Sequence, residues 1–412
     1  ARMMVKLLDE WVPIIKGSEI NDDPLSPISS LGKKIIEEDG DDTKIDWMHR
    51  SERFYEKLAT PDVTVSDLIG DIDPIKAASL KLSYADERVI HFGMIPRANR
   101  CIFVINELPD LQARIQVSLF SILEEKEIQI RGFKLRIPLD LQFIFTANPE
   151  DYTNRGSIVT PLKDRIGSQI ITHYPHTLSI AKRITKQESD IIQSSVYIPE
   201  LAHDLIEEIN FAARKSEYVD FKSGVSARMS ITAFENLVST AKRRMLINNE
   251  EKTSIRLSDF TGIIPAINGK IELVYEGEEQ GADQISFNLI NEGVKTIFLR
   301  FFPEISKLEK PNEATPYDKI LTWFVENGTE LFLGDEFTNK EYQDSLDEIK
   351  PLNELVKKYC KEINTEDIAF IKEVLLWGLS SFKKLSKNRM LDGIEFKDSL
   401  GSYLKNLNSD QI

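Results

Sequence analysis

The sequence has little cysteine, no paired metal-ligand motif and no long apolar run. Its 412 residues include two cysteines, Cys101 and Cys360, and their number and separation exclude a disulfide scaffold and a Cys-built zinc site. The five histidines are scattered, and the lack of a HExxH or close His/Cys spacing argues against a metalloenzyme. No stretch of about 18 apolar residues and no signal peptide are visible. The sequence therefore predicts a protein of the reducing cytoplasm without a membrane span.

The sequence also lacks an excess of basic residues. Lysine and arginine number 52, whereas aspartate and glutamate number 67, which gives a formal net charge of −15. Non-specific binding to nucleic acid requires a basic face, so this balance disfavours nucleic acid as a partner. The apolar fraction of 41% is that of an ordinary globular protein. At this length we expect about two to three domains.

Strand and helix patterns alternate in the middle of the first half of the chain. The run CIFVI at 101–105 is wholly apolar, which is typical of a strand buried in a parallel sheet. A helix with one apolar face is expected at 112–124, and alternating apolar and polar residues predict a β-hairpin at 128–137. The run QFIFTAN at 142–148 predicts a second buried strand. Two buried strands separated in this way predict an α/β layered fold.

Elsewhere the patterns predict mainly helices and loops. An amphipathic helix that starts at Ala1 and a polar loop at 17–50 are expected, followed by a strand that begins at Val63 and Val65. After Pro175 strand signals stop, so the chain is expected to be all-α from there and helical throughout 284–412. The clearest helices are predicted at 199–214, 226–247, 256–273 and 366–383, the last with Thr365 as its N-cap.

Polar side chains follow both predicted buried strands. Asn106 and Glu107 end the first, and Asn148 ends the second. The carboxyl ends of parallel strands meet at one edge of the sheet, where nucleotides bind in α/β folds. Glu107 is a candidate to orient or deprotonate an attacking water there, and Asn106 stands where a side chain would help to hold Mg²⁺. The alternative interpretation is an ordinary strand-to-helix turn.

The order of these elements, followed by PLKDRIG at 161–167, resembles the AAA+ ATPases that carry a helix-2 insert and a pre-sensor-1 hairpin. This branch contains the magnesium-chelatase I subunit and the MoxR-type ATPases. The resemblance covers residues 1–275 and is carried by the segments ATPDVTVSDLIGDIDPIKAASLKLS, HFGMIPRANRCIFVINELPDL and NPEDYTNRGSIVTPLKDRIG. It implies a parallel αβα core at 1–175 and a helical lid at 176–275. Residues 276–412 are expected to form an additional C-terminal helical domain.

The resemblance implies roles for several of these residues. Asn106 and Glu107 correspond to the Walker B pair, and Asn148 corresponds to sensor 1. The segment 126–138 resembles the pre-sensor-1 hairpin, and residues 72–95 resemble the helix-2 insert.

Three arginines have implied roles as well. Arg165 resembles the arginine finger, which would reach the γ-phosphate bound by an adjacent subunit, and Arg155 is the second candidate for that role. Arg228, in GVSARMS, resembles sensor 2 on the lid and would touch the phosphates. The alternatives are an ordinary surface charge for Arg165 and a helix-start salt bridge for Arg228.

Two features depart from the family pattern. No GxxxxGK[ST] phosphate loop is present, although such a loop supplies the backbone cradle and the lysine for the phosphates. Because Ala1 begins within an expected helix, where this loop should end, we expect the natural chain to continue upstream. Asn106 replaces the usual Walker B aspartate, and its neutral oxygen would hold Mg²⁺ more weakly.

The sequence therefore supports two hypotheses of different classes. The first is a Mg²⁺-dependent AAA+ ATPase that binds and hydrolyses ATP as a homo-oligomeric ring, expected to be hexameric. It would remodel or activate a partner protein together with a von Willebrand A-domain protein. The second, which Asn106 favours, is a nucleotide-gated assembly scaffold that binds ATP or ADP with little or no hydrolysis.

Overall fold

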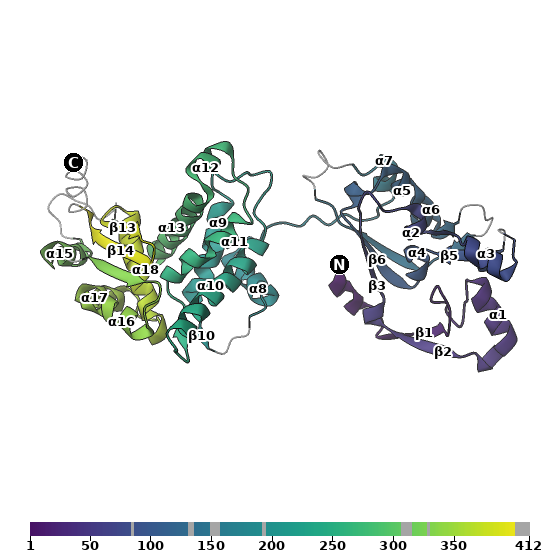
Figure 1. Cartoon of the computed structure of the whole chain (residues 1–412), viewed down its shortest axis with the longest axis horizontal. Helices are drawn as coiled ribbons and strands as arrows, with labels where there is room; N and C mark the ends of the chain where they lie inside the picture. Colours follow the sequence, from purple (N-terminus) through teal and green to yellow (C-terminus); the bar gives the residue numbers. More distant parts are fainter. Residues whose placement is uncertain are drawn as a thin grey trace. The chain divides into compact units, whose positions relative to one another are not determined.

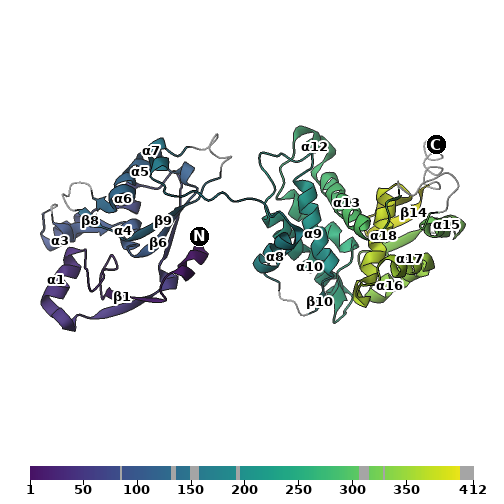
Figure 2. The same cartoon turned by 180° about the vertical axis from the view of Figure 1, so that it is seen from behind.

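The computed structural model describes residues 1–83, 86–130, 136–148, 157–191, 195–305, 315–327 and 330–399. The chain divides into two compact units, Ala1–Ile171 and Thr172–Ile412 (Figures 1 and 2). The second unit includes both the predicted lid and the predicted C-terminal domain, and the division into three domains stays a prediction. In the described part of the chain, no helix is both long enough and apolar enough to cross a membrane.

A three-stranded parallel sheet forms the centre of the first unit. β6 (Cys101–Asn106) lies between β3 (Phe54–Leu58) and β9 (Leu141–Phe145); β3 is labelled in Figure 1 and β9 in Figure 2. The first five residues of β6 are all buried, as expected for a strand covered on both faces. The predicted α/β layered core is confirmed. Because the strands are parallel, their carboxyl ends meet at one edge of the sheet.

Three antiparallel strand pairs also belong to the first unit. They are β1 (Trp11–Ile15) with β2 (Ile45–His49), β4 (Gly70–Ile72) with β5 (Ile90–Phe92), and β7 (Glu127–Gln129) with β8 (Arg136–Pro138). The last pair confirms the predicted hairpin, whose residues 131–135 lie outside the described part. The helices are α1 (Ser30–Asp39), α2 (Val65–Leu68), α3 (Pro74–Leu80), α4 (Met94–Arg97), α5 (Ala113–Ser118), α6 (Phe120–Glu125) and α7 (Thr160–Asp164).

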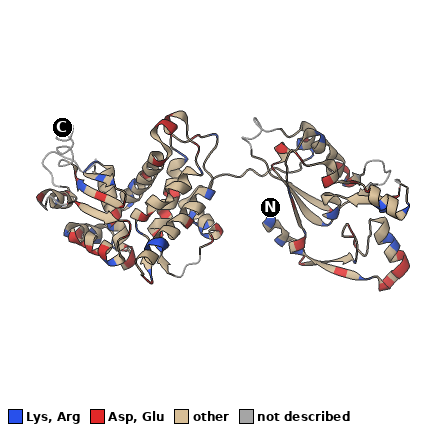
Figure 3. Ribbon diagram, in the orientation of Figure 1, with Lys and Arg blue, Asp and Glu red and all other residues tan. Residues whose placement is uncertain are grey.

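The prediction of a polar loop at 17–50 is wrong, because this segment contains α1 and β2. The hydroxyl of Ser29 caps α1 by accepting the N–H of Gly32 at 2.8 Å. Asp22 fixes the preceding turn by accepting the N–H groups of Ile28 and Ser29. These bonds satisfy donors that an uncapped helix start would leave free. The acidic end of α1 (Figure 3), which suggested a solvated loop, is the exposed last turn of a capped helix.

Two other expectations near the N-terminus also differ from the structure. Arg2–Leu7 forms a 3₁₀ helix, η1, in which no residue is buried, so no amphipathic packing occurs there. Val65 begins the short helix α2 instead of a strand. Thr64 and Asp67 form a capping box around its first turn, and these local hydrogen bonds outweigh the strand propensity of valine.

The second unit is mainly helical. The helices predicted at 199–214 and 226–247 are α9 (Glu200–Ala213) and α10 (Arg228–Ile247). One hydrophobic core extends from Ala202 to Phe396, so the predicted lid and C-terminal segments share it. The other helices are α8 (Leu178–Glu188), α11 (Ile264–Asn268), α12 (Tyr275–Gln280), α13 (Ala282–Phe301), α15 (Asp318–Asn327), α16 (Asn339–Glu348), α17 (Lys350–Tyr359) and α18 (Ile368–Ser381).

The second unit also contains strands that the sequence patterns do not predict. β14 (Gly393–Asp398) lies between β12 (Leu331–Gly334) and β13 (Leu385–Arg389) in an antiparallel sheet. A short parallel pair joins β10 (Val196–Tyr197) to β11 (Thr253–Ser254). The expectation of helix throughout 284–412 is therefore wrong for the sheet. One of its two outer strands, β13 (LSKNR), is largely polar and lacks the alternation that marks a strand.

Two helix boundaries differ as well. The helix predicted at 256–273 is a 3₁₀ helix, η7 (Ser258–Ile263), followed by the five-residue α11. Pro265 lies in the first turn of α11, where its missing N–H is tolerated, and it cannot donate a bond to a continuous preceding helix. Thr365 is not the N-cap of α18, because it belongs to the 3₁₀ turn η8 (Thr365–Asp367) that precedes Ile368.

Candidate functional site

The carboxyl ends of β6 and β9 bring Asn106, Glu107 and Thr146 together. The hydroxyl of Thr146 donates to Asn106 Oδ1 at 3.1 Å and accepts the N–H of Glu107 at 3.2 Å. The backbone carbonyl of Thr146 accepts the N–H of Leu108 at 2.9 Å. The neighbouring strand thus fixes the backbone on both sides of Glu107. It also fixes the side-chain amide of Asn106.

Glu107 has a left-handed backbone, with φ at 55° and ψ at 50°. This conformation is uncommon for a residue other than glycine and costs about 1–3 kcal/mol. Such strain persists where the surrounding structure holds it, and it concentrates at functional sites. The hydrogen bonds to Thr146 hold the turn here, so the backbone of the half-buried Glu107 is fixed at the sheet edge.

Glu56, on β3, belongs to the same edge and was missed by the sequence analysis. Glu56 Oε1 accepts a hydrogen bond from Asn106 Nδ2 at 2.5 Å, and Oε2 lies 2.9 Å from the Arg2 guanidinium. The bonds from Arg2 and then Asn106 hold the pKa of Glu56 below its ordinary value. The alternation in FYEKL was the available signal for a strand. Only the parallel register, in which Leu58 pairs with Asn106, places this carboxylate at the site.

Asn148 follows β9 two residues after Thr146, at the same end of the sheet. It is exposed, and its side-chain amide has no hydrogen-bond partner among the residues that the structure describes. Of the predicted residues, Asn106 ends β6, Glu107 follows it, and Asn148 follows the neighbouring parallel strand β9.

Residues 47–166, from β2 to just beyond α7, match the AAA domain of the dynein-related subfamily. This part of the chain is an AAA+ domain. No curated protein matches the chain.

Several solved structures resemble the chain at low identity. A protein from Cytophaga hutchinsonii, described as an ATPase candidate, is 21% identical over 58% of this chain and 77% of its own, with a TM-score of 0.24. A magnesium chelatase BchI–BchD complex gives 15% identity over 68% and 85%, with a TM-score of 0.34. NtrX from Brucella abortus gives 14% identity over 62% and 53%, with a TM-score of 0.35. With scores below 0.5, none of these likenesses decides the AAA+ branch.

The oxygen donors at this edge of the AAA+ domain fit a magnesium ion. Mg²⁺ takes oxygen ligands and usually keeps several waters beside one or two carboxylates and the substrate phosphates. Asn106 offers a carbonyl oxygen, and Glu56 offers a carboxylate beside it. In the described ranges no group of three or more His, Cys, Asp or Glu residues could hold a metal. Waters and phosphates would therefore complete the shell of a metal ion here.

Arg165, predicted to be the arginine finger, is held within its own AAA+ domain. Its Nε and Nη2 donate to Glu124 Oε2 at 2.8 and 2.6 Å, and Nη1 donates to the carbonyl of Pro161 at 2.9 Å. The guanidinium also lies 4.9 Å from the centroid of the Phe120 ring. A role in an adjacent subunit requires release of these bonds. The second candidate, Arg155, lies outside the described residues.

Arg228, predicted to be sensor 2, is the first residue of α10 in the second unit. Its backbone N–H donates to Ser226 Oγ at 3.2 Å, and its side chain is exposed. No carboxylate pairs with its guanidinium among the described residues, so the alternative of a helix-start salt bridge lacks a partner there. A cation at a helix N-terminus opposes the helix dipole. The position therefore gives no local electrostatic stabilisation that would explain the arginine.

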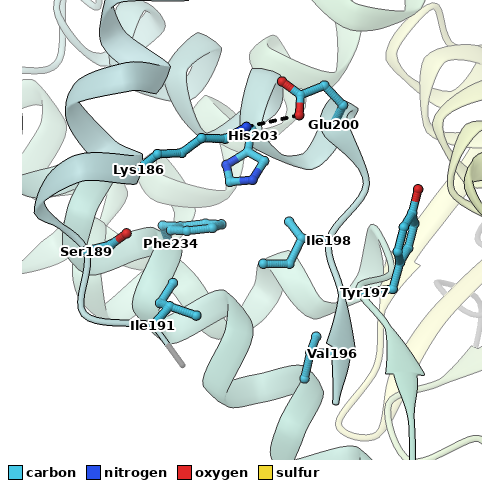
Figure 4. A pocket seen from close by; sticks show the side chains of 9 residues that line it. All are labelled: Lys186, Ser189, Ile191, Val196, Tyr197, Ile198, Glu200, His203 and Phe234. Carbon is cyan, nitrogen blue, oxygen red and sulfur yellow. Dashed lines mark hydrogen bonds and ion pairs between the residues drawn. The ribbon is translucent and has the colours of Figure 1, made fainter. Parts of the chain in front are cut away.

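The second unit contains a separate cavity of about 440 Å³ that no predicted site residue lines (Figure 4). The imidazole of His203 packs against the Phe234 ring at 4.5 Å between centroids, and Lys186 pairs with Glu200 at 3.1 Å on its rim. Burial lowers the pKa of His203 to about 4. The imidazole is therefore neutral near pH 7 and can both donate and accept a hydrogen bond.

A second group of ionisable side chains lies buried in the core of the second unit. Arg244 pairs with Asp259 at 2.9 Å, and the Arg256 guanidinium lies 4.4 Å from the centroid of the Tyr342 ring. The hydroxyl of Tyr342 donates to Glu373 Oε2 at 2.6 Å. Burial raises the pKa of Glu373 to about 7. These side chains, which we call the buried network, join residues from the predicted lid to residues from the predicted C-terminal domain.

Proposed function

We propose that this AAA+ protein hydrolyses ATP at the edge formed by β3, β6 and β9. The observation that carries the proposal is the left-handed Glu107, held by Thr146 beside Asn106. A glutamate whose backbone is fixed at the end of a central parallel strand suits the activation of water beside a bound nucleotide. In this site Glu107 accepts the proton of the attacking water.

The remaining residues have distinct roles in the proposed reaction. The exposed Asn148 orients the same water or the γ-phosphate. Arg165 of one subunit, once released from Glu124, neutralises charge that develops on the phosphate bound by the next subunit. Arg228 contacts the phosphates from the second unit. These assignments rest on the resemblance at the motif residues and on the exposure of the Asn148 and Arg228 side chains.

Magnesium would be held by Asn106 together with phosphate oxygens and water. When bound, Mg²⁺ neutralises charge on the β- and γ-phosphates. Glu56 places a carboxylate beside Asn106, and release of the Arg2 guanidinium that pairs with it would make this negative charge available to the metal ion. This carboxylate supports a functional metal site despite the departure from the Walker B pattern.

The proposed branch and mode of action follow the resemblance of the motif segments. We infer a ring of identical subunits, expected to be hexameric, of the chelatase or MoxR type. Its hydrolysis cycle would remodel or activate a protein partner together with a von Willebrand A-domain protein. The free thiols of Cys101 and Cys360, both buried, suit the reducing cytoplasm proposed as its location.

Steady-state ATP turnover at increasing Mg²⁺ concentrations tests this function. Because the 412 residues contain no GxxxxGK[ST] loop, the assay uses the protein as its gene encodes it, with any residues that precede Ala1. Glu107→Gln keeps the size of the side chain and removes the base, so we expect turnover to fall about 10²- to 10⁴-fold. Glu37→Gln, on the exposed face of α1, is the matched control. Equal turnover in the wild type and Glu107→Gln would contradict the proposal.

The second candidate function is a nucleotide-gated scaffold, which the neutral Asn106 favours. A scaffold would change its assembly size between ATP and ADP while turning over little ATP. Light scattering with ATP, ADP and a slowly hydrolysed analogue separates the two functions. Nucleotide-dependent assembly without Glu107-dependent turnover would support the scaffold. Assembly that ignores the nucleotide would contradict both.

A further inference from the structure

Tyr174 connects the start of the second unit to the turn that precedes α10. It lies in the segment between Thr172, where the unit begins, and α8. Its hydroxyl accepts the backbone N–H of Val225 at 3.0 Å. Its ring lies 4.0 Å from the Arg214 guanidinium, whose Nε donates to the Val225 carbonyl at 3.1 Å. Tyr174 and Arg214 thus hold both backbone polar groups of Val225.

Gly224 makes this contact possible. Its φ of +66° is a left-handed conformation that favours glycine. A Cβ at this position would overlap the Tyr174 hydroxyl, whereas the next nearest atom, Tyr174 Cζ, would lie at 3.7 Å. The turn before α10 is therefore shaped around the tyrosine hydroxyl.

The backbone is also held on the C-terminal side of Arg228, within the first turn of α10. Ser230, two residues into α10, donates to the buried carboxylate of Glu207 at 2.9 Å and accepts from Asn210 at 2.6 Å. Val225 and Ser230 are both almost fully buried. Arg228 itself is exposed and lies between these two anchored residues. Its backbone position depends on Val225, which Tyr174 holds, and on Ser230, which Glu207 holds.

We propose that Tyr174 is a positioning residue for Arg228. It ties the segment that enters the second unit to the turn before α10, so that a displacement of this segment reaches the Arg228 guanidinium. Tyr174 is 47% exposed, so its position depends on these directed contacts more than on burial. This inference rests on the proposed function, in which Arg228 contacts the phosphates of ATP.

A double-mutant cycle on ATP turnover tests the inference. Tyr174→Phe keeps the ring on Arg214 and removes the acceptor for the Val225 N–H. A misplaced phosphate contact affects the reaction more than binding, so we expect kcat to fall about 10- to 100-fold with little change in KM. In the Arg228→Ala background the same change should alter kcat by less than about twofold. Tyr275→Phe, at an exposed tyrosine without a hydroxyl partner among the described residues, should leave kcat unchanged.

The outcomes separate the positioning role from other roles. An equal loss of kcat in both backgrounds would show that Tyr174 acts independently of Arg228. No loss in the wild-type background would show that the contact between Tyr174 and Val225 does not affect turnover. Either result overturns the inference while the proposed function stands. Wild-type turnover that depends on neither Glu107 nor Arg228 would instead overturn the proposed function, and this inference with it.

Hydrogen exchange of the Val225 amide tests the contact without ATP. Tyr174→Phe should speed this exchange, and Tyr275→Phe should not. Gly224→Ala should disturb the exchange more in the wild type than in Tyr174→Phe, because removal of the hydroxyl relieves the overlap with Cβ. Equal effects of Gly224→Ala in the two backgrounds would contradict the contact.

Discussion

The AAA+ sheet edge and the buried network each contain an arginine paired with a carboxylate, but the first pair is exposed to solvent and the second is buried. At the edge, the paired side chains of Arg2 and Glu56 are 79% and 38% exposed. In the buried network, those of Arg244 and Asp259 are 3% and 5% exposed. Water screens the first pair, so it contributes little to stability. The second pair has lost its hydration, so removal of either partner leaves the other charge buried and uncompensated, which is strongly destabilising.

This difference indicates what each group can do. The exposed Glu56 and the half-buried Glu107 can exchange partners with solvent or a ligand without unfolding the domain. Glu373 and Asp259 cannot exchange partners in this way, because loss of a partner leaves a buried polar atom unsatisfied. We therefore expect substitutions at the sheet edge to change rates and substitutions in the buried network to change stability.

The largest expected effect is on turnover when Arg165 is removed. If Arg165 acts on the neighbouring subunit, Arg165→Ala should lower kcat about 10³- to 10⁵-fold while ATP binding is retained. Stability should change by less than about 1 kcal/mol, because its partner Glu124 is largely exposed. Turnover and nucleotide binding are measured side by side. The control is Arg88→Ala, which removes an exposed arginine paired with Asp86. Unchanged turnover in Arg165→Ala would exclude the finger role.

The next largest effect is on stability when the buried pair is broken. Asp259→Ala leaves the Arg244 guanidinium buried without its carboxylate, so we expect the free energy of unfolding to fall by about 3–5 kcal/mol. Glu354→Ala breaks the exposed Lys319–Glu354 pair, whose side chains are 75% and 62% exposed. It should cost less than about 1 kcal/mol. Urea unfolding measures both, and equal losses would remove the contrast between buried and exposed pairs.

The buried carboxyl group of Glu373 makes the stability of the second unit depend on pH. Burial raises its pKa from 4.5 to about 7, so between these pH values the native state holds a proton that the unfolded state has released. Its contribution to the free energy of unfolding therefore falls as pH rises across this window. Glu373→Gln should remove this fall. As pH rises across the window, the free energy of unfolding of the variant should therefore increase relative to that of the wild type by up to about 1.4 kcal/mol per pH unit.

Urea unfolding at several pH values between 5 and 8 measures this gain. His203, with its pKa lowered to about 4, adds an opposite slope between that value and 6.5. This slope is common to both proteins and cancels in the difference. Parallel stability profiles for the wild type and Glu373→Gln would show that Glu373 does not titrate in this window.

The smallest effect is expected at Asn106. Asn106→Asp adds a charge near the proposed Mg²⁺ site, and a unit charge at about 4 Å in a water-like dielectric contributes about 1 kcal/mol. The Mg²⁺ concentration for half-maximal turnover should therefore fall about fivefold. Without Mg²⁺ the variant should lose about 1 kcal/mol of stability, because Glu56 loses the hydrogen bond from Asn106 Nδ2. An unchanged Mg²⁺ requirement would exclude Asn106 from the metal site.

Local patterns were enough to predict the parts of the fold whose burial follows a simple rule. The wholly apolar β6 indicated a buried parallel strand, and the periodic α9 and α10 indicated packed helices. The capped α1 and the polar strand β13 were missed. The stability of α1 depends on hydrogen bonds to Asp22, and that of β13 depends on pairing with β14, neither of which local hydropathy records.

The candidate site was predictable only where it follows strand ends. Asn106, Glu107 and Asn148 could be proposed because a strand's carboxyl end is a fixed place in sequence. Glu56 was not found, because it reaches Asn106 through the register of two strands 50 residues apart. The engagement of Arg165 by Glu124 is also a tertiary contact, across 41 residues. Spacing alone does not reveal such partners.

The most direct test of this account compares one Glu→Gln substitution in each region. Glu107→Gln should lower ATP turnover about 10²- to 10⁴-fold and leave the free energy of unfolding within about 0.5 kcal/mol of the wild type. Glu373→Gln should keep turnover within about twofold and change the pH dependence of stability. Turnover in Glu107→Gln equal to that of the wild type, or a comparable loss of turnover in Glu373→Gln, would contradict the assignment of catalysis to the sheet edge.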